Sequence, residues 1–371
     1  MKSVQQKGFL LPLTIICAAT SCAESPDLDF EEQEVTQSIA VFSPGDEHSP
    51  RVVVRGGYVF WSRANGTIER STVTGAGRQV YCNECNSEID STPIAVDAQL
   101  VLFFAAKSGN KWTIASQPIG GYPLYVGDAT LENDGMRVSP NVPILVDDAA
   151  NGYVYYVVQP VSGGAKQVYK IKKDGTGSRV PLYTQPPVSE TLWNGGFAQT
   201  SATTNGDLFF SQGPNIKRIP KTPGTVTNFA TTTEGFHLHT GSRGVSECKY
   251  LYWVRQSGAV RAKYYGPTSP VPSGCMTVYN TTLFTDNDGS LHRFNGLTKK
   301  QFEETYFYPF VANAVGQTNF IKRFKAVGGF HTLEAPGNVV AVPRDLTYDV
   351  GSDAIYWGDG DGIWRFTAPG Q

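Results

Sequence analysis

The sequence has little charge and no excess of either sign. Its 371 residues include 31 Lys and Arg against 33 Asp and Glu, and charged residues make up only 17% of the chain. Nucleic-acid binding needs clustered basic charge, so the composition gives no reason to expect such a partner. Histidine occurs five times, and no G-x-S-x-G elbow, phosphate-binding loop or zinc-protease motif is present. No motif therefore indicates a standard enzyme class.

Long apolar runs are also scarce, and the first one is short. Lys2 and Lys7 precede an apolar stretch at 9–19, which is too short to span a bilayer as a helix and is typical of an export signal. Residues 19–22 resemble the lipobox of bacterial lipoproteins, which implies a signal peptide at 1–21 and a lipid on Cys22. The alternative is an ordinary secretory signal cleaved nearby, for instance after Ala23. We expect an outer-membrane or cell-surface lipoprotein, or else a periplasmic or secreted protein.

The next segment, 22–34, is predicted to be an acidic tether. Six acids fall within 24–34, with too little apolar surface to order the segment. It would hold a single folded domain, 35–371, away from the lipid surface. The lipid would then be the only attachment to the membrane.

Aromatic residues, glycine and proline are abundant. Aromatics make up 12% of the chain, with 39 Gly and 23 Pro, which is the composition of a turn-rich β protein. An aliphatic residue followed by one or two aromatics recurs at intervals averaging near fifty residues, which indicates that one supersecondary unit is repeated. The seven copies of this aliphatic–aromatic phrase are 59–61, 102–104, 154–156, 208–210, 251–253, 283–285 and 355–357.

Each copy lies within a longer unit. A Gly/Asn/Asp turn follows it, and then a strand with an aliphatic residue and a base two positions later, as in Ile216-Lys217-Arg218 and Ile363-Trp364-Arg365. Ahead of the phrase, some units carry an apolar run that ends in Asp97, Asp147 or Asp349. We therefore predict an all-β fold, a β-propeller of four-stranded antiparallel blades.

The chain ends predict how the ring closes. The last unit stops after its third strand, and 34–42 contains a spare strand that we expect to complete the last blade. Seven blades are favoured, with six or eight as alternatives. The alternatives arise from the 72-residue gap between Leu283 and Ile355, which contains the segments 306–310 and 319–324. It is either a degenerate eighth blade or an outer hairpin of blade six. Pro309 within it lacks the donor that a central strand needs.

Some of these units resemble a known family. Leu283-Phe284-Thr285-Asp286 and Ile355-Tyr356-Trp357-Gly358-Asp359 resemble the YWTD repeats of low-density-lipoprotein-receptor-type propellers. The chain as a whole also resembles secreted bacterial lipoproteins built from similar units. The resemblance implies a docking scaffold, and it carries over no catalytic residues.

Four cysteines remain besides Cys17 in the signal and Cys22. Cys82 and Cys85 form a C-x-x-C pair, which in an oxidising compartment favours a disulfide over free thiols or a metal. Cys248 and Cys275 are predicted to form a second disulfide, although the strand register places them near opposite ends of adjacent strands.

The remaining candidates for chemistry are few. His237 and His239, with Glu234 upstream, are either a metal or acid–base pair near the pore or a polar strand face. The acids that end the inner strands are expected to cap turns and to pair with the recurring bases between blades. Asp-rich turns at 286–289 and 359–362 are interpreted as hairpins rather than calcium loops, since most ligands are missing. We expect no cofactor and no metal.

The sequence favours a lipid-anchored, monomeric binding scaffold for a protein or glycan at the cell surface over an enzyme. The alternative is a lyase or hydrolase with its site at the central pore. Aromatics outside the packing positions of a repeat are common interface anchors. The predicted contact surface is Trp193 with Tyr306, Phe307, Tyr308 and Phe310.

Overall fold

β-Branched and aromatic residues in short runs, separated by Gly- and Asp-containing turns, fold here into strands and turns. The computed structural model describes residues 39–42, 51–63, 66–82, 92–108, 111–126, 135–140, 142–162, 165–184, 196–200, 206–231, 236–243, 245–255, 259–266, 281–285, 292–301, 305–313, 320–325, 330–333, 346–349, 351–352, 354–359 and 362–367. Within these ranges there is no helix, and so none that could cross a membrane.

The described strands form seven antiparallel sheets. Sheet 1 is β2 (Arg51–Arg55), β3 (Tyr58–Ser62), β4 (Ile68–Thr72) and β5 (Gln79–Cys82). Sheet 2 is β6 (Ile94–Val96), β7 (Val101–Ser108), β8 (Lys111–Pro118) and β9 (Leu124–Tyr125). Sheet 3 is β10 (Met136–Val138), β11 (Leu145–Val146), β12 (Tyr153–Pro160), β13 (Gln167–Lys172) and β14 (Val180–Thr184), with β10 and β11 both pairing with β12.

The remaining four sheets have four strands each. Sheet 4 is β15 (Phe197–Gln199), β16 (Asp207–Gln212), β17 (Asn215–Pro220) and β18 (Thr227–Thr231). Sheet 5 is β19 (Phe236–Arg243), β20 (Val245–Arg255), β21 (Ala259–Tyr264) and β22 (Thr281–Thr285). Sheet 6 is β23 (His292–Gln301), β24 (Thr305–Asn313), β25 (Phe320–Lys325) and β26 (Phe330–Leu333). Sheet 7 is β27 (Leu346–Asp349), β28 (Ala354–Asp359), β29 (Gly362–Thr367) and β1 (Ile39–Phe42).

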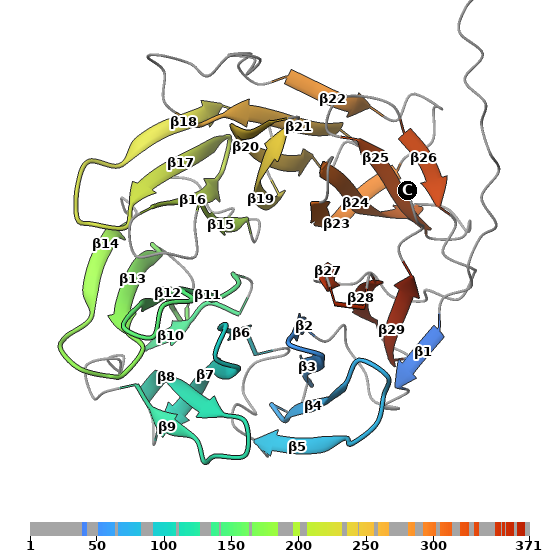
Figure 1. Ribbon diagram of the computed structural model, residues 1–371. Helices are drawn as coiled ribbons and strands as arrows, with labels where there is room; N and C mark the ends of the chain where they lie inside the picture. The colour runs from blue at the N-terminus through green and yellow to red at the C-terminus, as the bar shows by residue number, and fades with distance from the viewer. Residues whose placement is uncertain are drawn as a thin grey trace, which may run out of the picture. The chain divides into compact units, whose positions relative to one another are not determined.

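The sheets follow one another around a ring (Figure 1). Their innermost strands contact one another in the order β2, β6, β11, β15, β19, β23 and β27, and β27 contacts β2 again. Each sheet therefore has a neighbour on both faces. This arrangement confirms the predicted all-β propeller of antiparallel sheets, although sheet 3 has five strands rather than four.

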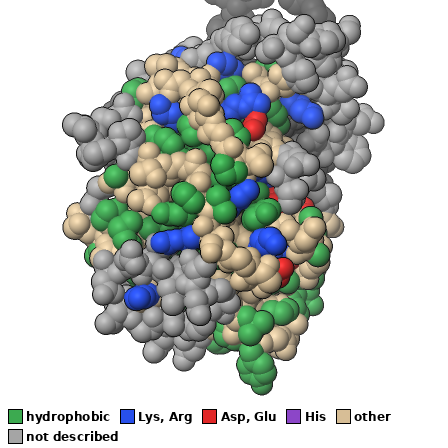
Figure 2. Space-filling model, turned by 90° about the vertical axis from the view of Figure 1, so that its left-hand side faces the viewer, with side chains coloured by type: hydrophobic (Ala, Val, Ile, Leu, Met, Phe, Trp, Pro, Cys, Tyr) green, Lys and Arg blue, Asp and Glu red, His purple; other side chains and the backbone are tan. Residues whose placement is uncertain are grey.

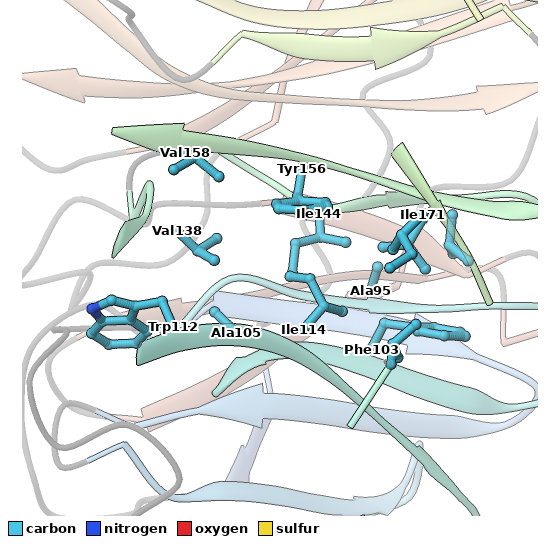
Figure 3. Packing of buried hydrophobic residues seen from close by; sticks show 13 residues of the cluster. Ala95, Phe103, Ala105, Trp112, Ile114, Val138, Ile144, Tyr156, Val158 and Ile171 are labelled. Carbon is cyan, nitrogen blue, oxygen red and sulfur yellow. The ribbon is translucent and has the colours of Figure 1, made fainter. Parts of the chain in front are cut away.

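The aliphatic–aromatic phrase explains why the sheets stack. In six of its seven copies it lies on the strand beside the innermost one, and there every residue of the phrase is at most 1% exposed. Successive side chains of a strand point to opposite faces, so each phrase supplies both interfaces. Phe103 belongs to the same buried cluster as Tyr156 of sheet 3 (Figure 3), whereas Leu102 and Phe104 belong to the cluster that contains Phe60 of sheet 1.

The outermost strands share an irregularity that the sequence did not suggest. In sheets 1, 3, 4, 5 and 7 the register shifts at the same point, after the aliphatic residue of the third strand. One residue of the outer strand is skipped there, as in a β-bulge. The skipped residues are Tyr81, Leu182, Phe229, Leu283 and Val41, and the first three are buried.

The bulge corrects the interpretation of the sixth phrase. Leu283 is the bulge residue of β22, the outermost strand of sheet 5, rather than part of a second strand. The second strand of sheet 6 is instead β24, which contains 306–310. That segment is therefore neither an eighth unit nor an outer hairpin. Pro309 pairs with Leu297 of β23, and the ladder to β25 has no partners for Tyr308 and Pro309, as expected where a donor is missing.

The predicted closure is confirmed. β1 pairs with β29, so the first described strand completes the sheet that the last strands of the chain begin. The unit that contains both, Val35–Gln371, is compact. Asp359 of β28 and Gly362 of β29 are register partners, as the hairpin interpreted from this sequence requires.

Candidate functional site

The Asp residues that end the innermost strands cap the turns that follow, as predicted. Asp97 Oδ1 accepts hydrogen bonds from the backbone N–H groups of Gln99 (3.0 Å) and Val101 (2.9 Å). Asp349 Oδ2 accepts one from Ser352 N at 2.9 Å. These bonds satisfy donors that the turn would otherwise leave unpaired.

Two of these acids also bind a lysine of the next sheet. Lys173, which follows β13 of sheet 3, forms an ion pair with Asp97 of sheet 2. Lys221, which follows β17 of sheet 4, reaches Asp147 Oδ1 of sheet 3 at 2.9 Å, and both side chains are 0% exposed. Lys173 Nζ also donates to the backbone oxygen of Asp147 at 2.9 Å. The two pairs thus form one network, the inter-sheet ion network, that links sheets 2, 3 and 4.

Asp147 lies at the centre of this network. Its Oδ2 accepts hydrogen bonds from Tyr155 Oη (3.0 Å) and Tyr153 N (3.1 Å), while Lys221 occupies Oδ1. Gly152 is required beside it, because a Cβ at that position would lie 2.4 Å from Asp147 Cβ. Lys170, opposite Tyr155 in the ladder, donates to the backbone oxygen of Lys221 at 2.6 Å.

Burial is the largest cause of the pKa shifts of Lys221, Lys170 and Tyr155. Loss of water lowers the pKa of Lys221, and the hydrogen bond and charge of Asp147 offset part of that effect. Desolvation likewise lowers the pKa of Lys170. The pKa of the Tyr155 hydroxyl is raised, first by burial and then by the neighbouring carboxylate. Tyr155 is therefore a hydrogen-bond donor at neutral pH, and the network stabilises contacts between sheets rather than moving protons.

The recurring base on the third strand is also structural. Arg70, Lys170, Arg218 and Arg365 each pair in register with the middle aromatic of their sheet's phrase. The Arg70 guanidinium lies between the Tyr58 and Tyr81 rings, 4.8 and 5.3 Å from their centroids. Arg218 Nε donates to Asp207 at 2.6 Å. Arg70 and Arg218 are thus engaged with groups of their own sheets, although the Arg218 side chain remains 38% exposed.

The predicted histidine pair lies on β19, an innermost strand. Leu238 between the two is buried in the core that sheets 4 and 5 share, and the register of β19 is irregular between Phe236 and His239. Glu234 and the imidazoles of His237 and His239 lie outside the described part, so their role stays a prediction. In the part of the chain that the structure describes, no group of three or more His, Cys, Asp or Glu could hold a metal ion.

The cysteine predictions are tested in one place. Cys82, at the end of β5, is disulfide-bonded. Cys85 and Cys275 lie outside the described residues, as does Cys22, and Cys248 lies on β20. The two pairings and the lipid on Cys22 remain predictions.

Four of the five residues of the predicted aromatic contact surface lie on an interior strand. Tyr306, Phe307, Tyr308 and Phe310 are on β24, which pairs with β23 and β25. Their side chains and Trp193 are outside the described part. The corresponding strands of the other sheets carry buried aromatics, so the position on β24 also suits packing.

The exposed charges are unevenly divided. Among side chains whose burial is described, Asp148, Asp174 and Asp207 are the acids that are not buried. Many more Lys and Arg side chains are partly or fully exposed, and Figure 2 shows more of them than acids on one face. One pair crosses between sheets, since Arg55 of sheet 1 lies 2.7 Å from Asp148 of sheet 3.

Sequence reasoning anticipated the acids of the inter-sheet ion network and missed its lysines. Lys173 and Lys221 immediately follow the third strands β13 and β17. A charged residue next to a turn is normally solvated, so the sequence offered no reason to predict that either lysine is buried in an ion pair. The signal that could have identified them was their shared position after the third strand of successive units.

No protein-family model and no curated protein matches the chain. Among solved structures, the β-propeller domain of Cps50 (Swd1) from Myceliophteria thermophila is similar, with a TM-score of 0.57 and 13% identity over 90% of this chain and 100% of that one. The computationally designed Ika8 protein is similar with a TM-score of 0.50 and 13% identity over 88% of this chain and 99% of that one. At these identities the likeness shows the fold alone, and the fold is a β-propeller.

Proposed function

We propose that this chain is a binding scaffold: a β-propeller, anchored to the bacterial envelope by a lipid on Cys22, that docks a protein or glycan. Each of the seven sheets would be one blade, because their innermost strands contact one another in a closed order. The acidic segment 22–34 would keep the propeller away from the membrane surface.

One observation carries this proposal. The titratable groups of the inter-sheet ion network are buried between sheets and bonded to one another, with Asp147 and Lys221 both 0% exposed. A substrate cannot reach such a cluster, and its groups are engaged in holding the sheets together. The described exposed surface consists instead of strand edges and turns, on which a protein or glycan would dock.

The anchor and the binding are tested separately. Expression in a bacterium with a labelled fatty acid should give a labelled protein in the membrane fraction, and C22S should be unlabelled and soluble. An unlabelled wild type, or C22S that remains in the membrane fraction, would rule out the lipid. For binding, purified protein should give saturable binding to a glycan or to an isolated envelope protein. Failure against a full glycan array and against fractionated envelope proteins would reject the scaffold.

The alternative function is a pore-centred lyase or hydrolase, favoured by the position of His237 and His239 on an innermost strand. It predicts turnover of a glycan substrate that H237A or H239A abolishes while binding is retained. Turnover unaffected by both substitutions would remove these residues from consideration.

A further inference from the structure

Three polar side chains lie in a row at one end of sheet 3. Arg137 of β10 and Gln159 of β12 are register partners. Val158 pairs with Gln167 of β13, so Lys166, one residue earlier, lies beside Gln159 on the side away from β10. Side chains opposite one another in a ladder point to the same face of the sheet. Arg137, Gln159 and Lys166 therefore form one row, the donor row, across one face of sheet 3.

That face is turned toward sheet 4. Val157 of β12 and Val168 of β13 belong to the buried cluster that sheet 3 shares with sheet 4. Gln159 follows Val157 by two positions and Lys166 precedes Val168 by two, so both share its face. Arg137 and Lys166 are partly exposed, whereas Gln159 is 8% exposed. The donor row thus has a buried centre with a cation on each side that solvent can reach.

The amide of Gln159 is held in one orientation. Its Oε1 accepts a hydrogen bond from Ser139 Oγ at 2.8 Å, and Ser139 is 0% exposed. Because that bond occupies the oxygen, the amide NH₂ group is the end that remains to donate. No acceptor for this NH₂ group is found among the described residues, although donors of side chains buried this deeply are normally bonded.

The two cations lie far from the acids of their own and the neighbouring sheet. The Arg137 Nε atom is buried and has no hydrogen-bond partner in the described structure. Burial, and then the charge of Arg137, lower the pKa of Lys166 to about 8, so the two cations are close enough to repel. The acids of sheets 3 and 4 that the structure describes lie at the opposite end, where β12 and β16 begin; they are Asp147, Asp148, Asp174 and Asp207.

We propose that the donor row binds an oxyanion group: a carboxylate, a sulfate or a phosphate. Arg137 and Lys166 would donate charge-assisted hydrogen bonds to its oxygens, and the NH₂ group of Gln159 would donate between them. An anion would satisfy the amide and also offset the repulsion between the two cations, whereas a water molecule would do only the first. The site consists of side chains of sheet 3 alone, so it goes beyond the scaffold function and does not depend on it.

The test follows the Lys166 side chain by NMR. The purified protein is reductively methylated with isotopically labelled formaldehyde, which keeps the charge of each lysine, and the Lys166 signal is identified by its absence from K166M. Sodium sulfate, sodium phosphate and sodium glucuronate are titrated separately at neutral pH and constant ionic strength, with sodium chloride as the balance. At least one of them should shift the Lys166 signal saturably, and the ion that binds most tightly identifies the group that the site prefers.

Substitutions locate the site. R137M should weaken binding roughly tenfold or more, because it removes a charge-assisted hydrogen bond. Q159E places a carboxylate between the two cations and should abolish binding. K172M is the matched control, since Lys172 is exposed at the other end of β13, and it should bind normally.

A second measurement needs no added ligand. In sodium chloride alone, the change in thermal midpoint caused by Q159E should be more favourable in wild type than in R137M. The reason is that the new carboxylate has both cations beside it in wild type and has lost one of them in R137M.

Absence of a saturable shift with all three ions, a shift that sodium chloride alone reproduces, or normal binding by R137M would overturn the proposal. Equal effects of Q159E in the two backgrounds would also overturn it. None of these results affects the docking of glycans or envelope proteins by wild type, which tests the scaffold function itself.

Discussion

The central pair of the inter-sheet ion network, Asp147 with Lys221, gives the sharpest prediction for stability. The perturbation is D147N, which keeps the size of the side chain and removes its charge. Lys221 is 0% exposed and would then be buried without its counter-ion. Tyr155 and the N–H of Tyr153 can still donate to the remaining amide oxygen, so the loss concerns the ion pair.

The magnitude follows from burial. Removing one partner of a buried ion pair costs about 3–5 kcal/mol, because the other charge stays desolvated. Replacing both partners with apolar groups is often nearly neutral, so D147L combined with K221M should recover most of the loss. The deficit should also depend on pH. Desolvation already lowers the pKa of Lys221 below its unfolded value of 10.5, and D147N removes the offsetting charge and lowers it further. The unfolded state then binds more protons, so the deficit should shrink as pH rises toward 10.5.

The assay is urea unfolding of wild type, D147N, K221M and D147L/K221M from pH 7 upward, with the slope of the transition checked for constancy. A loss below about 1 kcal/mol for D147N would refute the argument from burial. A double variant no more stable than the weaker single variant would refute the coupling between the two residues.

Three further predictions concern other parts of the propeller. F229A removes a buried bulge side chain and should lower the free energy of unfolding in urea by about 3–5 kcal/mol. V80A, at a 58% exposed position, should change that free energy by less than about 0.5 kcal/mol. Equal effects of the two substitutions would show that bulge residues do not pack between sheets. Burial first, and Arg137 second, lower the pKa of Lys166 to about 8. Between pH 8 and 10.5 the unfolded state therefore binds more protons, so wild type should gain stability relative to K166M as the pH rises. Parallel pH profiles of stability for the two proteins would contradict this. G56A should lower the free energy of unfolding by about 1–3 kcal/mol or more, because Gly56 has a φ of 57° and a Cβ there would lie 2.6 Å from Leu100 Cδ2. G57A is the matched control: Gly57 also has a positive φ, 79°, but open space around it, so this substitution should cost less. Thermal unfolding of the two glycine variants measures the difference, which should vanish if Leu100 can move aside.

The fold was largely predictable because its determinants are periodic. The phrase at 59–61 and its five equivalents place buried apolar side chains on both faces of a strand. Such a strand can bury both sets of side chains only if another sheet packs against each face of its own sheet. The spare strand before residue 42 and the missing fourth strand at the C-terminus predicted closure for the same reason.

The sixth copy of the phrase was wrongly predicted because its local sequence resembles the true copies. Leu283-Phe284 has the composition of the phrase, but its position is that of Tyr81 and Phe229, which are bulge residues of outer strands. Composition alone cannot distinguish two buried positions that both favour large apolar side chains. Pro309 argued against a central strand, and pairing with β23 outweighed the missing donor.

The inter-sheet ion network was predictable only in part. Asp97 and Asp147 end recognisable runs, whereas the partners Lys173 and Lys221 are brought to them by the ring, across 76 and 74 positions of sequence. Such pairs depend on which sheets become neighbours, which no local pattern encodes.

The arrangement of the seven sheets depends on closure of the ring by β1, and a cross-link between β1 and β29 tests that closure most directly. Ala40 and Trp364 are register partners in β1 and β29. A protein carrying A40C and W364C should form an intramolecular disulfide between these positions, identified by peptide mapping without reduction, while A40C with V80C should not. Failure of the first pair to link under oxidising conditions, or equal linking of both, would contradict a ring closed by the N-terminal strand.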